Sequence, residues 1–436
     1  MQQDSTIISS KRDKKPRIFY GWYIVIASVL SNAYLSTAFF QGFSVFFLPI
    51  VNEFGWTRAQ TSVAFSLRQL EIGILAPLMG FLVDRLGGRK VIIICMVISG
   101  FGLVLMSRIN SLWTFYATFA LISVGVSGAS HGISWPTVVA AWFNRLRGRA
   151  LGFTFLGPVV GAPAIILVVL LEQAVGWRLS VLYLGIGIWL VGIPLGVLAR
   201  SNPTDYGYLP DGDLPNEETN NEPADPKNPR EDFPSDHMMT GHTATMALQT
   251  KAFWLLVGLY GLHGIGLSGF FVHQIPFFEH IGFSTAQSAM TVSVMFTASG
   301  IGRLSAGFLM DLIDWRIIML VVMITQTLDL FALIYVSEYW QALVFSVIMG
   351  IGFGATIPSR PILVGKYFGM RAYGTIQGLL QGSAIASGVA GPIIMGWVFD
   401  QYLSYNPAIV GFTALTALTI PVILLCRNPE TNYNYS

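Results

Sequence analysis

Several charged side chains lie inside long apolar stretches of the sequence, where an unused charge is costly. Arg303 stands out because no acidic residue lies one turn away from it along a helix. A guanidinium group can bind a carboxylate through two parallel hydrogen bonds. The sequence therefore predicts Arg303 as the receptor for an anionic substrate. An ion pair with Glu71 or Asp329 from another helix is the open alternative.

Three further charged residues in such stretches are candidates for the site. Arg360 directly precedes Pro361 and is interpreted either as substrate-binding or as reaching the lipid headgroups. Arg68 and Glu71 are three positions apart, so they share one face of a helix. We interpret Arg68 and Glu71 as coupling or gating residues, with a structural ion pair between them as the alternative. Burial would also allow Glu71 to carry a proton.

Histidines and neutral polar residues complete the candidate site. An imidazole titrates near neutral pH, although a neutral histidine bonded to a neighbouring helix is the ordinary arrangement. The apolar stretches contain His131, His263 and His273. His131 is a candidate for coupling and His273 for contacting the substrate. Polar residues of the first stretch are candidates for hydrogen bonding a bound anion, with helix packing as the alternative: Asn32, Tyr34 and Gln41.

The composition predicts what positions these residues. Charged residues make up 11% of the 436-residue chain and apolar residues 53%. Soluble domains carry roughly 25% charged residues. The net charge of +2 and the two cysteines also argue against a nucleic-acid-binding protein and a disulfide scaffold. The sequence predicts an all-α polytopic membrane protein.

Apolar stretches long enough to cross a bilayer occur twelve times. They cover residues 20–50, 60–83, 91–107, 112–143, 150–173, 177–199, 252–278, 285–310, 317–336, 339–367, 372–399 and 406–426. Most of the 25 Lys and Arg residues fall on one side if both termini are cytoplasmic. We therefore expect a plasma-membrane protein with that orientation.

The chain divides into five predicted parts. Residues 200–250 are rich in proline and acidic residues, which is typical of a disordered or loosely held linker. The other parts are tails at 1–19 and 428–436 and six-helix bundles at 20–199 and 251–427.

The two predicted bundles repeat each other. Pro49, Gly55, Ala59 and Gln60 recur in order as Pro276, Gly282, Ala286 and Gln287. Gly80-Phe81-Leu82 and Asp84 recur as Gly307-Phe308-Leu309 and Asp311. The pattern indicates two homologous halves, an arrangement common in secondary transporters, whose substrate site lies between the halves.

A loop between the second and third predicted helices carries a family signature. It reads Gly80-Phe81-Leu82-Val83-Asp84-Arg85-Leu86-Gly87-Gly88-Arg89-Lys90 and resembles the loop motif of the major facilitator superfamily. The resemblance implies two pseudo-symmetric six-helix bundles and identifies Gly80, Asp84, Arg85, Gly87, Arg89, Lys90 and, in the second half, Asp311 as motif residues. Charge alone suggests that Asp84 accepts hydrogen bonds from a helix N-terminus.

Finer features resemble monocarboxylate porters and oxalate/formate antiporters. They include Gly21-Trp22, Trp142-Phe143, Gly176-Trp177-Arg178, Arg303 and Gly307. This resemblance implies transport of an organic anion. The chain departs from the porters at two positions, because Gln41 replaces a lysine and Ser299 replaces an aspartate. The oxalate-type lysine of helix eleven is also missing from residues 378–381. Proton coupling by the family route is therefore not expected.

Residues 157–162 resemble the Gly-Pro motif of proton-driven drug exporters. Small residues at this spacing let helices approach closely, and we expect Gly157 and Gly161 to pack between the two halves.

These observations together predict a secondary active transporter of a small organic anion, most simply a monocarboxylate. It would act as a monomer in the bilayer, with a proton as a candidate co-substrate. No phosphate-binding loop or metal-ligand spacing occurs, so no enzyme, metal or other cofactor is expected, and no nucleic-acid partner. An exporter of amphiphilic compounds and, more remotely, a non-transporting membrane sensor are the alternatives.

Overall fold

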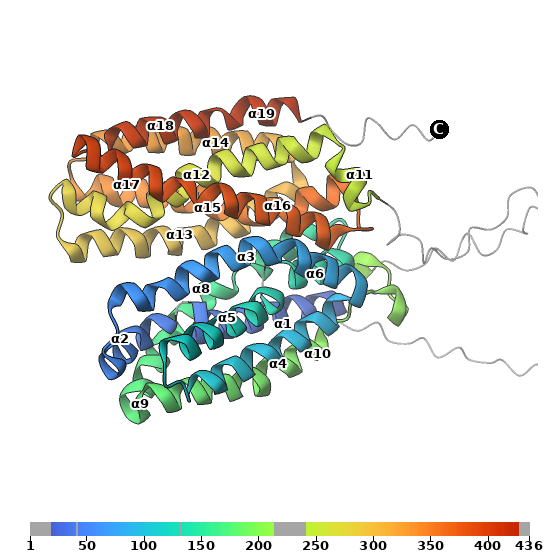
Figure 1. Ribbon diagram of the computed structural model, residues 1–436. Helices are drawn as coiled ribbons and strands as arrows, with labels where there is room; N and C mark the ends of the chain where they lie inside the picture. Colours follow the sequence, from blue (N-terminus) through green and yellow to red (C-terminus); the bar gives the residue numbers. More distant parts are fainter. Residues whose placement is uncertain (1–18, 41, 131, 213–240, 427–436) are drawn as a thin grey trace, which may run out of the picture.

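The computed structural model describes residues 19–40, 42–130, 132–212 and 241–426. The helices of the described chain form two bundles that lie side by side (Figure 1). The first helix begins and the last helix ends at the same end of the molecule, which we call the termini end. The opposite end is called the distal end.

The first bundle contains the helices before residue 200. They are α1 (Tyr20–Leu35), α2 (Phe43–Phe54), α3 (Arg58–Leu86), α4 (Gly88–Met106), α5 (Leu112–Ala129), α6 (Ser134–Trp142), α7 (Arg147–Thr154), α8 (Gly157–Gly161), α9 (Ile165–Gly187) and α10 (Ile193–Leu198). Short π-helical turns join α1 to α2 at Ser36–Phe40 and α9 to α10 at Ile188–Gly192.

The second bundle contains the helices after residue 243. They are α11 (Ala244–Leu248), α12 (Lys251–His280), α13 (Thr285–Leu312), α14 (Trp315–Ala332), α15 (Tyr339–Phe368), α16 (Tyr373–Gly388), α17 (Ala390–Tyr402), α18 (Asn406–Ala417) and α19 (Thr419–Leu425).

The described chain makes the twelve crossings that the sequence predicts. Ten stretches are long and apolar enough to cross a membrane. One of them, Arg147–Leu198, leaves the helical conformation at Gly176, where φ is 78°, and crosses twice. The 29-residue α3 supplies the remaining crossing. The predicted fold class, an all-α membrane protein of two six-helix bundles, is confirmed.

The sequence repeat has a local structural reason. Gly55 and Gly282 both adopt positive φ, 65° and 104°, which a glycine tolerates in the turn before a helix. Gln60 and Gln287 each complete a capping box, with Thr57 at α3 and Ser284 at α13. The caps satisfy backbone N–H groups that have no partner within the helix. The recurring residues therefore fix where the second helix of each bundle begins.

Several crossings are broken where the sequence suggests continuous helices. The fourth crossing is interrupted between α5 and α6, the fifth between α7 and α8, and the eleventh between α16 and α17. Phe155 lies between α7 and α8, so its carbonyl oxygen is not part of a continuous helix. Such irregular backbone is tolerated at membrane depth only where protein or a water-filled cavity surrounds it.

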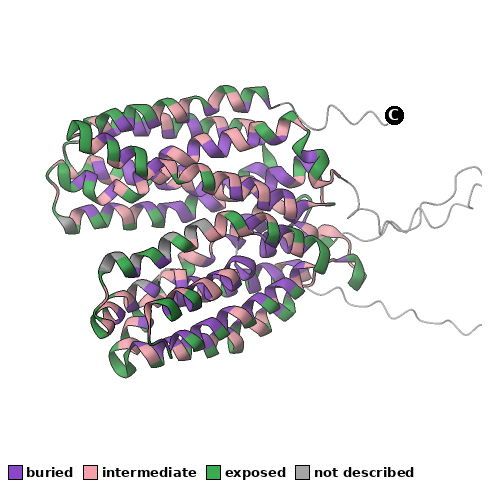
Figure 2. Ribbon diagram, viewed as in Figure 1, coloured by how far each residue is buried: buried purple, intermediate pink, exposed green. Residues whose placement is uncertain are grey.

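Burial follows the bundle architecture. Buried residues line the inside of each bundle, and exposed residues face outward (Figure 2). Large apolar side chains such as Ile74, Leu190 and Trp113 are among the exposed ones. An apolar exterior of this kind matches the hydrocarbon of a bilayer.

Candidate functional site

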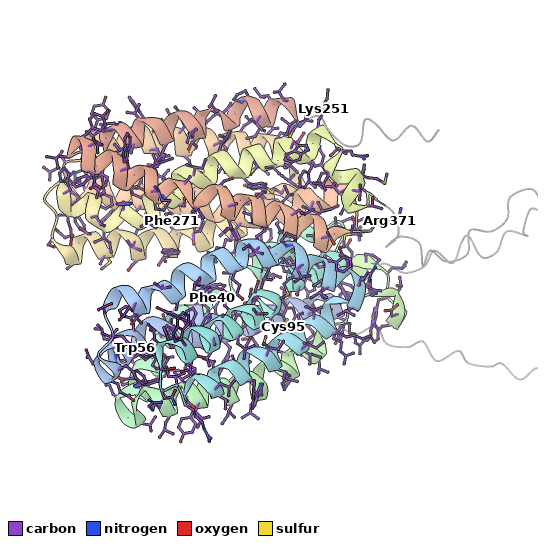
Figure 3. All side chains as sticks on the ribbon, in the orientation of Figure 1. Phe40, Trp56, Cys95, Lys251, Phe271 and Arg371 are labelled. Carbon is purple, nitrogen blue, oxygen red and sulfur yellow. The ribbon has the colours of Figure 1, made fainter. Side chains whose placement is uncertain are left out.

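A cavity of about 660 Å³ lies in the second bundle, among α12, α15, α16 and α17. Its polar side chains come from α12 and α15: Tyr260, His263, Ser268, Thr356 and Arg360. Its apolar walls include Phe271, Phe353 and Ile385. Ile385 also touches Gly73 of α3, so one wall adjoins the first bundle. Phe271 and, in the first bundle, Phe40 lie on facing sides of the two bundles (Figure 3).

Arg360 is the cation of this cavity. Its guanidinium carbon lies 5.1 Å from the centre of the Tyr260 ring, a cation–π contact. Its Nε is buried and has no hydrogen-bond partner. None of the residues lining the cavity is acidic. The side chain therefore faces the cavity rather than the headgroups, and it retains hydrogen-bonding capacity for an anion.

His263 lines the same cavity from α12 and is 5% exposed. Its Nε2 lies 2.6 Å from Oε1 of Gln326 on α14. Gln326 directs its own amide nitrogen toward Met349, at 3.5 Å from the carbonyl oxygen. An amide oxygen only accepts hydrogen bonds, so Nε2 of His263 carries a hydrogen in this arrangement.

Arg303 lies at the contact between the bundles and does not line the cavity. It is 6% exposed, and Nη1 donates to the carbonyl oxygen of Phe155 at 2.7 Å. Its Nε is buried without a partner. Among the described residues it forms no ion pair with Glu71 or Asp329. The structure thus rejects the ion-pair alternative and separates Arg303 from Arg360.

Two aspartates join the bundles near the termini end. Asp84 at the end of α3 accepts hydrogen bonds from the backbone of Gly374 and Thr375 at the start of α16, at 2.8 and 2.7 Å. Asp311 of α13 accepts from Gly148 and Arg149 at the start of α7, at 2.7 and 2.9 Å. Each carboxylate lies at a helix N-terminus, where negative charge is stabilised.

Glycines make this contact possible. A Cβ atom on Gly80 would collide with the carbonyl oxygen of Gly374, and one on Gly148 with that of Gly307. The motif positions Gly80 and Asp84 therefore act together, because the glycine allows the approach and the aspartate bonds across it.

The remaining motif residues lie at the termini end. The Arg85 guanidinium lies over the Phe81 ring at 4.7 Å. Gly87 has a φ of 81°, which suits glycine at this turn. Arg89 donates its backbone N–H to Ser201 and bonds the Tyr206 hydroxyl through its side chain. Lys90 is exposed.

The first part of the linker is folded, which corrects the expectation of a loose segment. Asp211, whose side chain is 2% exposed, accepts backbone hydrogen bonds from Asn144, Arg145 and Leu146 at 3.0, 2.7 and 3.3 Å. The loop between α6 and α7 is therefore held by Asp211 on one side and by Asp311 on the other. Residues 213–240 lie outside the described chain.

The predicted coupling pair does not form an ion pair in the described structure. The Arg68 guanidinium instead lies 4.2 Å from the centre of the Phe40 ring and 5.3 Å from that of Phe39. Oε1 of Glu71 is buried without a partner. Both residues belong to α3 of the first bundle, and neither lines the cavity.

Other predicted binding residues do not line the cavity. Tyr34 donates its hydroxyl to the carbonyl of Leu184, toward α9, and the Asn32 amide donates to Ser28. His273 contacts the carbonyl of Pro392 at 3.2 Å and the hydroxyl of Tyr405 at 3.5 Å. These side chains pack within their own bundles. Gln41 and His131 lie outside the described residues.

The expected role of the Gly-Pro segment is also corrected. Gly157 and Gly161 pack against Asn32 and Ala33 of α1, inside the first bundle, rather than between the bundles. Gly148 and Gly152 of α7 are the glycines that face Gly307 across the interface.

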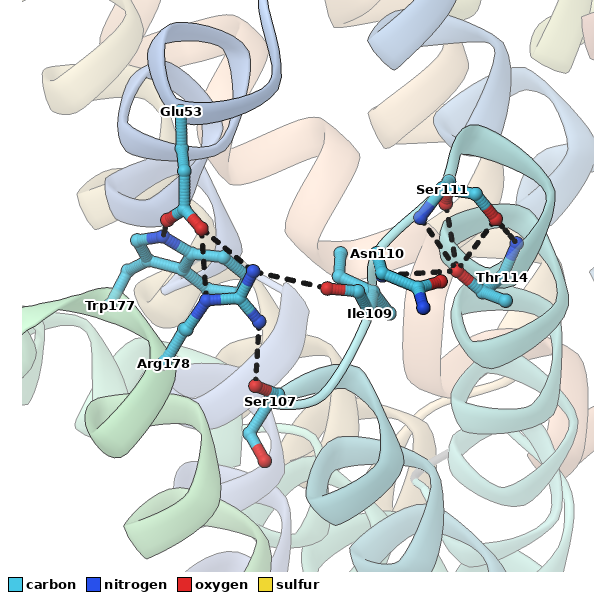
Figure 4. Close-up of polar contacts among 8 residues, drawn as sticks. All are labelled: Glu53, Ser107, Ile109, Asn110, Ser111, Thr114, Trp177 and Arg178. Atoms are coloured by element: carbon cyan, nitrogen blue, oxygen red, sulfur yellow. Dashed lines mark hydrogen bonds and ion pairs between the residues drawn. The ribbon is translucent and has the colours of Figure 1, made fainter.

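At the distal end, Arg178 ties three segments together (Figure 4). It donates to Glu53 through Nε and Nη2, at 3.0 and 2.7 Å, and to the carbonyls of Ser107 and Ile109. Trp177 donates to the same carboxylate at 2.6 Å. The Trp177-Arg178 pair, noted in the sequence only as a family resemblance, thus fixes the distal end of the first bundle.

Sequence reasoning missed most of the cavity. The sequence indicates no role for Tyr260, Gln326 and Phe353, and it identifies His263 only as one of three histidines that could carry a proton. A signal was present on α12, where Tyr260, His263, Leu267 and Phe271 follow helical spacing along one face. Nothing in the sequence indicated that this face meets Arg360.

Comparisons with known proteins agree with this architecture. The sequence profile of the Major Facilitator Superfamily matches residues 30–337 and 279–434. Human monocarboxylate transporter 7 is 22% identical over 94% of this chain and 86% of its own length. The class D tetracycline resistance protein of Salmonella ordonez is 23% identical over 81% and 84%.

The solved structures show the same fold. The proton:xylose symporter XylE, bound to 6-bromo-6-deoxy-D-glucose, superposes with a TM-score of 0.68. It covers 94% of this chain and 96% of its own, at 12% identity. With the profile match across both bundles, the duplicated crossings and the loop motif between α3 and α4, the chain belongs to the Major Facilitator Superfamily.

Proposed function

We propose that this protein is a secondary active transporter of a small organic anion, with monocarboxylates as the expected class. The observation that carries the proposal is Arg360, a guanidinium in a cavity whose lining contains no acidic residue. A carboxylate can satisfy the unpartnered Nε and neutralise the buried charge in one step. The similarity to monocarboxylate transporters supports the same substrate class.

We assign Arg303 to the same anion path, as a second buried cation that forms no ion pair with any acidic residue of the described chain. Its bond to the Phe155 carbonyl spans the two bundles, so relative movement of the bundles would break that bond. The guanidinium would then be able to contact the carboxylate. A bond exchange of this kind links substrate binding to rocking of the bundles, the movement by which such transporters expose one site alternately to each side.

The arrangement of contacts supports an outward-facing state. Among the described residues, the hydrogen bonds between the bundles come from Asp84, Asp311 and Arg303, between the middle of the molecule and the termini end. The ribbons diverge toward the distal end (Figure 1). The distribution of Lys and Arg supports a cytoplasmic position for the termini end. The plasma membrane is the proposed location. We propose that it works as a monomer.

A thermal-unfolding panel on the purified full-length protein tests the function. The panel contains benzoate, pyruvate, lactate, succinate and the amphiphilic cation tetraphenylphosphonium. A ligand that binds the folded state raises the melting temperature. We expect monocarboxylates to stabilise the wild type but neither Arg360→Gln nor Arg303→Gln. The matched control is Arg108→Gln, because Arg108 is exposed in a distal loop.

Binding is then followed by transport into proteoliposomes, using the radiolabelled acid that stabilises most strongly. Uptake that disappears in Arg360→Gln and persists in Arg108→Gln supports the proposal. An exporter of amphiphilic compounds is the second candidate, favoured by the apolar walls at Phe271 and Phe353. Stabilisation by the cation alone, unaffected by either arginine substitution, would replace the anion proposal with the exporter.

A further inference from the structure

The cavity places a titratable group beside its cation. His263 and Arg360 line the same cavity from facing helices, α12 and α15. The porter-type positions that would serve proton coupling are Gln41 and Ser299 in this chain, and the Ser299 hydroxyl is bonded to the carbonyl of Phe296. A proton site, if the transporter has one, must therefore use other residues.

We propose that His263 is the proton-binding residue of the transport site and that its protonation accompanies anion binding at Arg360. The proposal rests on the proposed anion-transport function. It assigns the coupled ion, a proton, and a residue for which neither the sequence motif nor the relatives provide a role.

The geometry identifies which nitrogen titrates. Gln326 accepts from Nε2 through its amide oxygen at 2.6 Å, so Nε2 keeps its hydrogen in both charge states. The proton is therefore gained and lost at Nδ1. Gln326 also fixes the ring orientation, because its own amide nitrogen is directed at Met349.

Electrostatics supplies the coupling. In the empty cavity the positive charge of Arg360 opposes a second positive charge on His263. An anion bound to Arg360 cancels that opposition, and a protonated His263 in turn attracts the anion. Each ligand therefore strengthens the binding of the other by the same factor. One proton and one monocarboxylate together carry no net charge, so the loaded and empty transporters have the same charge.

Few other ionisable groups surround His263. Arg360 faces it from α15, and Tyr260 lies one turn away on α12, with its hydroxyl bonded to Ser359. Cys426, directly after α19, is a buried thiol. The cavity residues of α16, of α17 and of the position between them are not ionisable: Ala384, Ile385, Gly388, Val389 and Pro392.

Asp329 is the competing proton carrier. It lies one helical turn after Gln326 on α14, is 7% exposed, and its Oδ2 has no hydrogen-bond partner. It does not line the cavity, so a bound anion would affect its charge less than that of His263. The experiment therefore includes both residues.

The test measures the affinity of purified full-length protein for benzoate, pyruvate and lactate between about pH 6 and pH 8, where imidazole titrates and these acids stay ionised. If one proton binds together with each anion, the apparent Kd for the anion increases about tenfold for each unit by which the pH rises. We expect this slope in the wild type and in His280→Gln, whose histidine is exposed at the distal end of α12. We expect a flat profile in His263→Gln.

Calorimetry on the wild type provides a measurement that does not depend on the folding of a variant. Binding heats in two buffers of different ionisation enthalpy should differ by the heat of about one proton per anion. Equal heats in both buffers would overturn the inference.

The remaining outcomes are distinguishable. A pH slope that persists in His263→Gln but disappears in Asp329→Asn assigns the proton to Asp329 and overturns the inference while leaving anion transport intact. If anion binding to the wild type does not depend on pH, the inference about His263 is also overturned, while the proposal of anion transport is unaffected. If none of the three acids binds at any pH, the proposed function itself fails.

Discussion

Asp84 Oδ1 lies 2.8 Å from the backbone nitrogen of Gly374, a residue 290 positions later in the chain. The bond connects the end of α3 to the start of α16, so it joins the two bundles. Asp311 forms the corresponding bond to Gly148, at 2.7 Å, with the roles of the bundles exchanged. The sequence repeat thus produces two equivalent contacts between the bundles, and each half contributes one carboxylate and one helix N-terminus. We call these two contacts, made by Asp84 and Asp311, the closure.

Replacing Asp84 by Asn should weaken this closure. The amide offers one acceptor atom instead of two and carries no charge, so the cap on α16 should lose about 1–2 kcal/mol. Hydrogen exchange measured by mass spectrometry should accelerate at the start of α16. Asp205→Asn is the control because Asp205 is exposed in the linker. Unchanged exchange at Gly374 and Thr375 in Asp84→Asn would show that the carboxylate does not hold the helix.

Gly80→Ala should open the same contact sterically. The new methyl group would collide with the backbone of Gly374, which cannot move independently of its helix. We expect reagents added from the termini side to label a cysteine that replaces the buried Gln377 of α16 faster in Gly80→Ala than in the wild-type background. The native Cys95 and Cys426 are buried. Gly258→Ala is the control, because a Cβ there meets nothing within 4 Å, and alanine in a helix is about 1 kcal/mol more favourable. Equal labelling in both variants would contradict the prediction.

The contributions of Asp211 and Asp311 to stability should be coupled, because both carboxylates bind the segment that joins α6 to α7. Asp211 holds residues 144–146 and Asp311 holds residues 148 and 149. Asn tolerates the positive φ of Asp211, 61°, so Asp211→Asn removes the charge without adding strain. A double-mutant cycle with Asp311→Asn, measured by thermal unfolding, should give a coupling of about 0.5–3 kcal/mol. If the stability lost in the double variant equals the sum of the losses in the two single variants, Asp211 and Asp311 act independently.

Arg178→Lys should destabilise the distal end of the first bundle. Lysine cannot reproduce the fork that reaches Glu53 and two backbone carbonyls at once. Loss of charge-assisted bonds should cost about 1.5–3 kcal/mol, reduced by the partial exposure of the pair. Thermal unfolding against Arg371→Lys, an exposed arginine, provides the comparison. A melting temperature equal to that of the control would show that the fork is dispensable.

Local sequence properties determined the topology of this protein. Apolar stretches of sufficient length specify crossings because the bilayer requires them, wherever each helix later packs. The duplication could be recognised in the sequence because the repeated residues act locally. A turn before a helix contains Gly55 or Gly282, and the cap of that helix contains Gln60 or Gln287. The capping role predicted for Asp84 is confirmed, although Gly374, in the helix that it caps, lies 290 positions later and is brought to Asp84 only by the tertiary structure.

Only the tertiary structure decided which polar residues share a site. Arg303 and Arg360 are both candidates for substrate binding in the sequence, yet Arg303 bonds to the Phe155 carbonyl and Arg360 lines the cavity. The rotation of each helix about its axis determines this difference, and it depends on packing across the whole bundle rather than on neighbours in the chain. The same applies to His263 and Gln326, 63 positions apart. Hydropathy specifies that a helix crosses the membrane, whereas packing between helices specifies which of its faces meets the substrate.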